Sequence, residues 1–217
     1  MNSISFDPTT IAIVLTTLTM APFVLMLVSS FVKIVVVLTL IRNALGVQQV
    51  PPNMVLNGIA IMLTIYIMYP IVQETFEITK GLEFDMNNIA TLKDPLAKAC
   101  GPLKKFLKKH TKSQGRAFFM STAKEIWPQE MQTGLEEGNL IVLIPAFIVS
   151  ELTDAFQIGF LLYLPFIAID MIVSNILLAM GMMMVSPMTI SLPFKLMLFV
   201  LVDGWTKMIE GIVKTYR

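Results

Sequence analysis

Apolar and charged positions occur along this chain in long blocks. Residues 8–32 and 43–73 carry no charged side chain, whereas residues 74–137 hold 19 of the 31 charged residues. Charges become sparse again beyond this segment until the C-terminal end. Because a membrane-crossing helix needs roughly 20 mainly apolar residues, the pattern predicts an all-α integral membrane protein of kinked helical hairpins with about four apolar spans. We expect an N-terminal hairpin over 1–73, a small helical polar insert over 74–137 and a second, kinked hairpin over 138–217.

The composition supports a membrane protein and excludes several other classes. Apolar residues make up 55% and charged residues 14% of the chain, and the mean hydropathy is +0.74; soluble domains are usually about 25% charged. A net charge of +1 gives no basis for nucleic-acid binding. The single Cys100 excludes an intrachain disulfide, and the lone His110 cannot anchor a multi-histidine metal site. We therefore expect no metal and no cofactor.

The first apolar segment, from about Thr9 to Ile41, is longer than one membrane span needs. It must therefore tilt, kink near Pro22 or extend beyond the bilayer. Lys33 lies within it. A lysine inside a membrane helix either faces a partner or water or extends its side chain to the interface, and the sequence leaves both interpretations open.

A polar turn separates this segment from a second apolar helix over about Met54–Val72. Gly46 can end the first helix, and two consecutive prolines cannot continue it. Arg42 is the only positive charge in this short loop, which favours a cytoplasmic turn and hence a periplasmic insert. The residues that define the turn are Arg42, Gly46, Pro51 and Pro52.

The polar insert contains ten positive and nine negative charges and two helical patterns. The first pattern predicts an amphipathic helix that extends to about Lys109. Pro102 limits where this helix can start. The second, from about Phe118 to Trp127, ends near Pro128. The lysines of the first helix could contact anionic lipid, although a solvated helix face is the favoured interpretation. The residues of the first pattern are Leu96, Leu103, Phe106 and Leu107, with Lys104, Lys105, Lys108 and Lys109.

The second apolar block, from about Leu140 to Val202, is interrupted by four prolines and by a methionine-rich stretch. Five of the eleven residues in 178–188 are Met, so we expect at least two long, kinked helices that are broken there. Met side chains are flexible and polarisable and repack easily. The stretch is therefore either an apolar turn between helices or a deformable collar that, repeated around an oligomer axis, seals a pore. The prolines are Pro145, Pro165, Pro187 and Pro193.

Several charged residues are embedded in this apolar block. Glu151 and Asp154 share a helix face, and Asp170 and Lys195 also lie in apolar sequence. An isolated charge in an apolar environment is unfavourable in free energy, so these groups should pair with one another or contact water. We predict that Glu151 pairs with Lys195, within one subunit or between subunits. Beyond this block, one charged face of a terminal helix is expected to carry Asp203, Lys207, Glu210 and Lys214.

Motifs that carry known enzyme chemistry are missing from the sequence. It contains no HExxH, GxSxG, P-loop or GxGxxG pattern. Ser191 and Lys195 are four residues apart and could form a Ser–Lys dyad, but no oxyanion site accompanies them. We therefore expect no enzyme. A small-molecule or ion transporter of the bacterial inner membrane is the alternative; transporters often show internal repeats, and none is clear here.

Three long strings of sequence carry a family resemblance. They are Ser29 through Asn53, Pro145 through Phe160, and Leu164 through Trp205. They resemble the FliP/SctR (YscR-like) family of type III secretion export-apparatus proteins. The N-terminus MNSISFDPTT shows no cleavable signal sequence, with which flagellar members typically begin, so the chain is most similar to the injectisome branch. Its first apolar segment is expected to act as an uncleaved signal anchor.

The resemblance implies a place in an assembly. Five copies are expected to join SctS-like and SctT-like subunits in an export gate of the bacterial inner membrane, near SctU-like and SctV-like proteins. Unfolded effector and needle proteins would pass through its channel. The family also implies that apolar helices can sit above the bilayer on the periplasmic side. The gasket role of the family's loop falls on Met182, Met183 and Met184, with Met188 as a weaker candidate.

Overall fold

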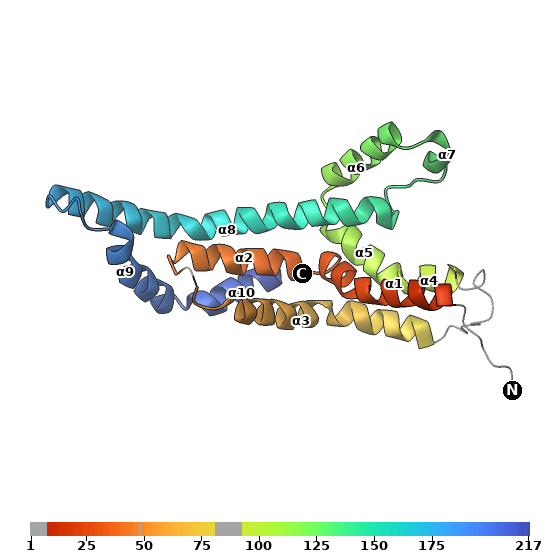
Figure 1. Ribbon diagram of the computed structural model, residues 1–217, viewed down its shortest axis with the longest axis horizontal. Helices are drawn as coiled ribbons and strands as arrows, with labels where there is room; N and C mark the ends of the chain where they lie inside the picture. Colours follow the sequence, from red (N-terminus) through yellow and green to blue (C-terminus); the bar gives the residue numbers. More distant parts are fainter. Residues whose placement is uncertain (1–7, 48, 81–92) are drawn as a thin grey trace.

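A computed structural model describes residues 8–47, 49–80 and 93–217 of the protein, and all regular secondary structure within them is helical. The predicted all-α class is confirmed. The longest helix, α8 (Leu140–Ala179), runs along the molecule, and the N-terminal hairpin lies beside it (Figure 1). The signal-sequence interpretation rests largely on residues 1–7, which lie outside the described residues, as does part of the insert, residues 81–92.

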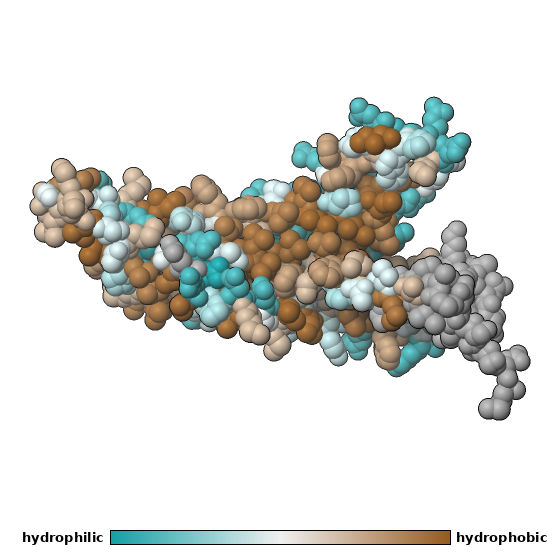
Figure 2. Space-filling view, viewed as in Figure 1, coloured by the Kyte–Doolittle hydropathy of each residue, from teal (hydrophilic) through white to brown (hydrophobic). Residues whose placement is uncertain are grey.

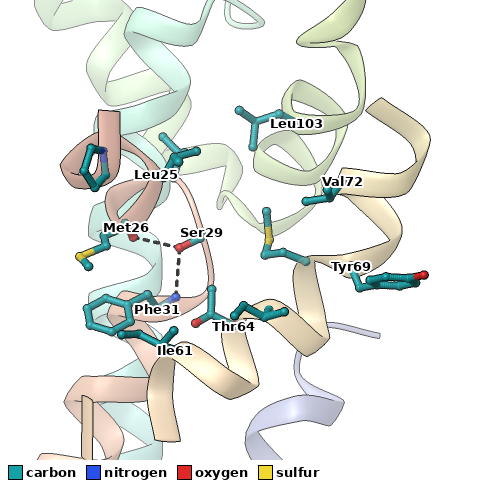
Figure 3. Close-up of a pocket in the computed structure, with 13 residues that line it drawn as sticks. Leu25, Met26, Ser29, Phe31, Ile61, Thr64, Tyr69, Val72 and Leu103 are labelled. Carbon is teal, nitrogen blue, oxygen red and sulfur yellow. Dashed lines mark hydrogen bonds between the residues drawn. The ribbon is translucent and has the colours of Figure 1, made fainter. Parts of the chain in front are cut away.

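The N-terminal segment is broken at Ser29 and not near Pro22, where a kink was one of the three alternatives that the sequence left open. Helices α1 (Pro8–Leu27) and α2 (Phe31–Ala44) meet at a bend of 68°. The Ser29 hydroxyl donates to the carbonyl of Met26 (3.1 Å) and accepts from the amide of Phe31 (3.4 Å) (Figure 3). A serine that bonds to local backbone groups in this way competes with the helical pattern, whereas Pro22 is accommodated inside α1.

The bend borders an apolar groove of about 460 Å³ between α1, α2, α3 (Asn53–Lys80) and α5 (Gly101–His110). Leu25, Phe31 and Ile61 contribute to its walls, and Leu103 of the insert closes one end (Figure 3). Two of the hydroxyl groups that line it, those of Ser29 and Thr64, donate to backbone carbonyls of their own segments.

The turn of the first hairpin is held by a buried arginine. After α2 ends, Gly46 adopts φ 81°, the left-handed conformation that a glycine after a helix readily takes. One terminal nitrogen of Arg42, Nη1, donates to the carbonyl of Pro51 (3.2 Å) and to Oδ1 of Asn53 (2.6 Å). Helix α3 (Asn53–Lys80) then runs past Pro70 and beyond the predicted boundary at residue 73.

The insert folds into four described helices, two of which match the predicted pair. Helix α5 has a proline in its first turn, as the sequence indicates, and α6 ends before Pro128. Leu96 belongs to a separate short helix. Phe106 and Leu107 pack with Leu143 and Phe147 of α8, so the insert is anchored on that helix. The helices are α4 (Lys93–Ala99), α5 (Gly101–His110), α6 (Ser113–Ile126) and α7 (Gln129–Gln132).

The C-terminal block breaks at the methionine stretch, as predicted. Helix α8 precedes it, and helices α9 (Pro187–Leu201) and α10 (Gly204–Lys214) follow. Helix α8 continues through both Pro145 and Pro165. At 1.5 Å per residue it is about 60 Å long, roughly twice the thickness of a bilayer's hydrocarbon core.

The described residues contain fewer candidate spans than the four predicted. Two helices, Asn53–Lys80 and Leu140–Ala179, are long and apolar enough to cross a membrane, and the bent α1–α2 pair would make three. The fourth candidate, α9, has 15 residues and a length of about 22 Å, which is short for a bilayer core of about 30 Å.

Most apolar side chains of the long helices point outward. Within the most apolar windows of α3 and α8, 11% and 17% of the residues are buried inside the chain. Figure 2 shows a largely hydrophobic band along α8, with hydrophilic residues gathered around α6 and α7. The buried core lies where α2 packs between α3 and α8, and Gly159 lets Leu40 approach the α8 backbone. The outer surface must therefore be covered by lipid or by other proteins.

Candidate functional site

A buried ion pair joins α2 to α8. Nζ of Lys33 lies 2.8 Å from Oε1 of Glu151, and the two side chains are 2% and 0% exposed. This contact is an ion pair that does not have the geometry of a regular hydrogen bond. The Tyr216 hydroxyl donates to the other carboxylate oxygen, and Lys33 Nζ lies 4.4 Å from the centre of the Tyr216 ring. The last turn of the chain thereby closes over the pair.

Asp154 extends the pair to the insert. Its Oδ2 lies 3.6 Å from Lys33 Nζ, and its Oδ1 lies 2.6 Å from Nζ of Lys112, which precedes α6. The backbone amide of Lys112 also donates to Oγ of Ser150 on α8 (3.1 Å). The resulting ionic cluster, defined as Lys33, Glu151, Asp154, Lys112 and Tyr216, connects α2, α8, the insert and the C-terminus.

His110, at the end of α5, borders this cluster. Its ring lies 5.1 Å from that of Tyr216 and 4.8 Å from that of Phe106, centre to centre. Burial, followed by the positive charges of Lys33 and Lys109, lowers the pKa of His110 to about 4, although Asp154 opposes the shift. The imidazole is therefore neutral at pH 7. Burial and the neighbouring Glu151 raise the pKa of Tyr216 above its usual range, so its hydroxyl keeps its proton.

A second ionic contact joins α8, α9 and the end of α2. Nζ of Lys195 lies 2.6 Å from Oδ2 of Asp170 and donates to the carbonyl of Ala44 (3.3 Å). The Ser191 hydroxyl donates to Oδ1 of the same carboxylate (2.5 Å). Ser191 and Lys195 are thus brought together, but both side chains are directed at the Asp170 carboxylate.

The predicted contact between Glu151 and Lys195 is wrong within one chain. Each residue has another partner, because α2 brings Lys33 to Glu151 while α9 brings Lys195 to Asp170, nearer the other end of α8. Within the described residues, Glu151 and Asp154 thus contact Lys33, and Asp170 contacts Lys195. Tyr216 and Lys112 were missed, because hydropathy does not show which polar residue at the end of a helix turns inward.

The methionine loop begins where α8 is stopped by a backbone motif. Gly181 adopts φ 75°. Its amide donates to the carbonyl of Leu178 (3.0 Å), and the amide of Met182 donates to that of Leu177 (2.9 Å). This pair of bonds is a Schellman motif, which satisfies the last carbonyls of a helix and turns the chain sharply.

The side chains of this loop are unusually exposed for apolar residues. Met183 and Met184 are 81% and 99% exposed, and Met182 and Met188 are 41% and 53% exposed. The loop forms one tip of the molecule, beyond the end of α8 (Figure 1). Groups of exposed apolar side chains are typical of surfaces that meet another molecule.

Comparison with known proteins places the chain in a family. Residues 14–212 match the FliP family. The chain is 51% identical over 210 residues to the Yop proteins translocation protein R of Yersinia pestis, with 97% of each chain covered. It is 43% identical over 216 residues to the harpin secretion protein HrcR of Erwinia amylovora, with 100% of each covered. It is 44% identical over 199 residues to the virulence protein YscR of Salmonella typhimurium, with 92% of each covered. These matches confirm the resemblance seen in the sequence: the chain belongs to the FliP family.

Proposed function

We propose that this protein is a channel-forming subunit of a type III secretion export gate, through which unfolded effector and needle proteins cross the bacterial inner membrane. The observation that carries the proposal is the similarity along nearly the whole chain to the Yop proteins translocation protein R. The role is structural, and the energy for export comes from other components.

The methionine loop is the proposed gasket of this channel. A gate for varied unfolded chains needs a seal without a fixed shape, and Met side chains can close on one another and part around a polypeptide. An apolar constriction also blocks ions, because water leaves it. The exposure of Met183 and Met184 supports this role, since neither side chain is committed to packing within its own subunit.

One loop cannot seal a channel, so the role requires an oligomer. We propose a pentamer that assembles with SctS-like and SctT-like subunits, next to SctU-like and SctV-like proteins. The outward-facing apolar surfaces of α3 and α8 support such an assembly, because the chain does not cover them itself. Whether Glu151 and Lys195 pair across subunits is a separate prediction that belongs to this assembly.

We further propose a multi-pass placement in the inner membrane, with the Arg42 turn on the cytoplasmic side and the insert in the periplasm. The length of α8, about twice the thickness of the bilayer core, supports an assembly that extends partly above the membrane on the periplasmic side.

Deletion and complementation test the proposed function. Removing the gene from the source bacterium should abolish secretion of effector and needle proteins into the medium, and the intact chain should restore it. The native mass of the complex isolated with the tagged chain should correspond to several copies together with small hydrophobic partners. Unimpaired secretion, or a monomer that binds a solute as a transporter would, contradicts the proposal.

Ion leak tests the gasket. Replacing Met182, Met183 and Met184 with Ala should raise the ion conductance of membranes that contain the assembled gate, because the smaller side chains no longer fill the constriction. Met54→Ala is the matched control, since Met54 is 86% exposed but lies at the start of α3. Unchanged leak in the triple variant, with the complex intact, contradicts the sealing role.

A further inference from the structure

A groove of about 740 Å³ lies between the middle of α3 and the C-terminal end of the chain. Met62 and Ile65 of α3 and Val213 of α10 give it apolar walls. The remaining wall is the segment that ends at Arg217, and Figure 1 shows the C-terminus beside the middle of the hairpin. The ring of Tyr216 also lines the groove, while its hydroxyl is bound to Glu151. The ionic cluster therefore fixes this wall in place.

The α3 side of the groove has the character of a surface that faces lipid. Helix α3 is one of the two described helices that are long and apolar enough to cross a membrane. Two aromatic residues that line the groove, Tyr66 and Tyr69, are 71% and 62% exposed. Tyrosine combines an apolar ring with a polar tip and is enriched where hydrocarbon meets the headgroup layer.

The C-terminal side of the groove carries two basic side chains. Lys214 and Arg217 both line it. Lys214 Nζ lies 2.5 Å from Oε1 of Glu210, and the two side chains are 66% and 55% exposed. Exposed ion pairs of this kind contribute little to stability. Among the residues that the structure describes, the Arg217 guanidinium has no carboxylate partner. Guanidinium groups bind phosphate through two parallel hydrogen bonds.

One kind of ligand fits both the apolar side and the basic side of the groove. We propose that the groove binds an anionic membrane phospholipid, with an acyl chain against the apolar walls and the phosphate between Lys214 and Arg217. Free phosphate would leave the apolar walls uncovered, and a purely apolar helix would leave the Arg217 guanidinium without a counter-ion. Basic residues beside a membrane helix are a known means of holding acidic headgroups. The inference needs only that α3 lies in a bilayer, so it stands or fails separately from the secretion role.

Native mass spectrometry of the full-length chain, purified in detergent, tests the site. Phosphatidylglycerol and phosphatidylcholine with identical acyl chains are added in turn, and the bound fraction is compared. We expect phosphatidylglycerol to be preferred. The variant that combines Lys214→Ala and Arg217→Ala should lose roughly tenfold to thirtyfold of that preference, as expected for two cations near a lipid phosphate. Lys207→Ala removes an exposed lysine of α10 that does not line the groove and should leave the preference unchanged.

A second variant separates the apolar walls from the charges. Replacing Tyr66 and Tyr69 with Ala should weaken the binding of both lipids while the preference between them persists. A photo-reactive residue at position 66, in native membranes, should capture phosphatidylglycerol. The proposal is overturned if the two lipids bind equally to the unmodified chain, if Lys207→Ala has the same effect as the double variant, if inorganic phosphate displaces the lipid, or if the photo-reactive residue captures a protein instead.

Discussion

The N-terminal half of α8 and the loop beyond its C-terminal end use opposite kinds of residue and stand in opposite relations to the rest of the chain. Near its N-terminal half, Glu151 is a charged residue with no exposed surface, and its partners come from α2 and the C-terminus. Beyond its C-terminal end, Met184 is an apolar residue that is 99% exposed. The charged residues find their partners within one chain, whereas the methionines of the loop are largely uncovered within it.

This contrast separates a structural requirement from a functional one. Charges in an apolar setting demand specific partners, because each unpaired charge is costly, so the cluster around Glu151 fixes how α2, α8 and the C-terminus fit together. Exposed methionines demand no particular neighbour. The loop can therefore pack against surfaces of different shape, whereas the ionic cluster needs the particular partners that it has.

The largest effect is expected from Glu151→Ala. The substitution leaves Lys33 charged and buried without its main counter-ion, and breaking a buried pair in this way costs about 3–5 kcal/mol. Thermal unfolding of the purified chain in mild detergent should show a strongly lowered midpoint or no folded protein at all.

A double variant provides the control. When Lys33→Met accompanies Glu151→Met, no charge is left unpaired, and apolar replacements of a buried pair are often close to neutral. The double variant should therefore recover most of the stability lost in Glu151→Ala. If it is as unstable as the single variant, the pair matters for a reason other than compensation of charge.

Tyr216→Phe should have the next largest effect. The substitution removes the hydroxyl that donates to Glu151 and keeps the ring beneath Lys33. A hydrogen bond to a charged group contributes about 1.5–3 kcal/mol, and the unfolding midpoint should fall accordingly. Tyr163→Phe, on α8 and packed beside the apolar core, is the matched control and should change stability by less than about 0.5 kcal/mol. Equal effects of the two variants would contradict the role of the Tyr216 hydroxyl.

Acidification should weaken the cluster through His110. Its pKa is lowered from 6.5 to about 4 in the folded chain, so the unfolded chain takes up the proton first as the pH falls below 6.5. Stability is then lost between pH 6.5 and about 4, and His110 contributes no pH dependence above that window. The loss is on the order of 1 kcal/mol, because the ring is partly exposed and its charge is partly screened.

Comparing the unfolding midpoints of the natural chain and of His110→Gln from pH 7 to pH 4 measures this contribution. Carboxylates titrate in both proteins, so the difference between the two curves isolates the imidazole. Parallel curves would show that His110 is not held neutral by its surroundings.

The fold class, the helix break at the methionines and the glycine that ends α2 all follow from the sequence, because each depends on local pattern. The partners of the charged residues do not. Lys33 and Glu151 are 118 positions apart in the sequence, and whether Glu151 faces Lys33 or Lys195 depends on how α2 and α9 are placed along α8. Hydropathy specifies that a buried charge needs a partner, but only the packing of helices specifies which one. The bend at Ser29 was missed for a related reason: Pro22 is the stronger helix breaker in general, yet the serine bonds to the backbone there.

The smallest effect on stability is expected at the tip. Replacing Met183 and Met184 with Ala should change the free energy of unfolding of the isolated chain by less than about 0.5 kcal/mol, because exposed side chains away from specific contacts contribute little. The same measurement that detects Glu151→Ala serves here, with Met54→Ala as the control, because the exposure of Met54 lies between those of Met183 and Met184. A large loss of stability would mean that the loop is part of the fold of one subunit, and any leak through the gate would then be a consequence of misfolding. An unchanged midpoint combined with a raised leak would assign the methionines to the channel, because their effect would then appear only where several copies meet.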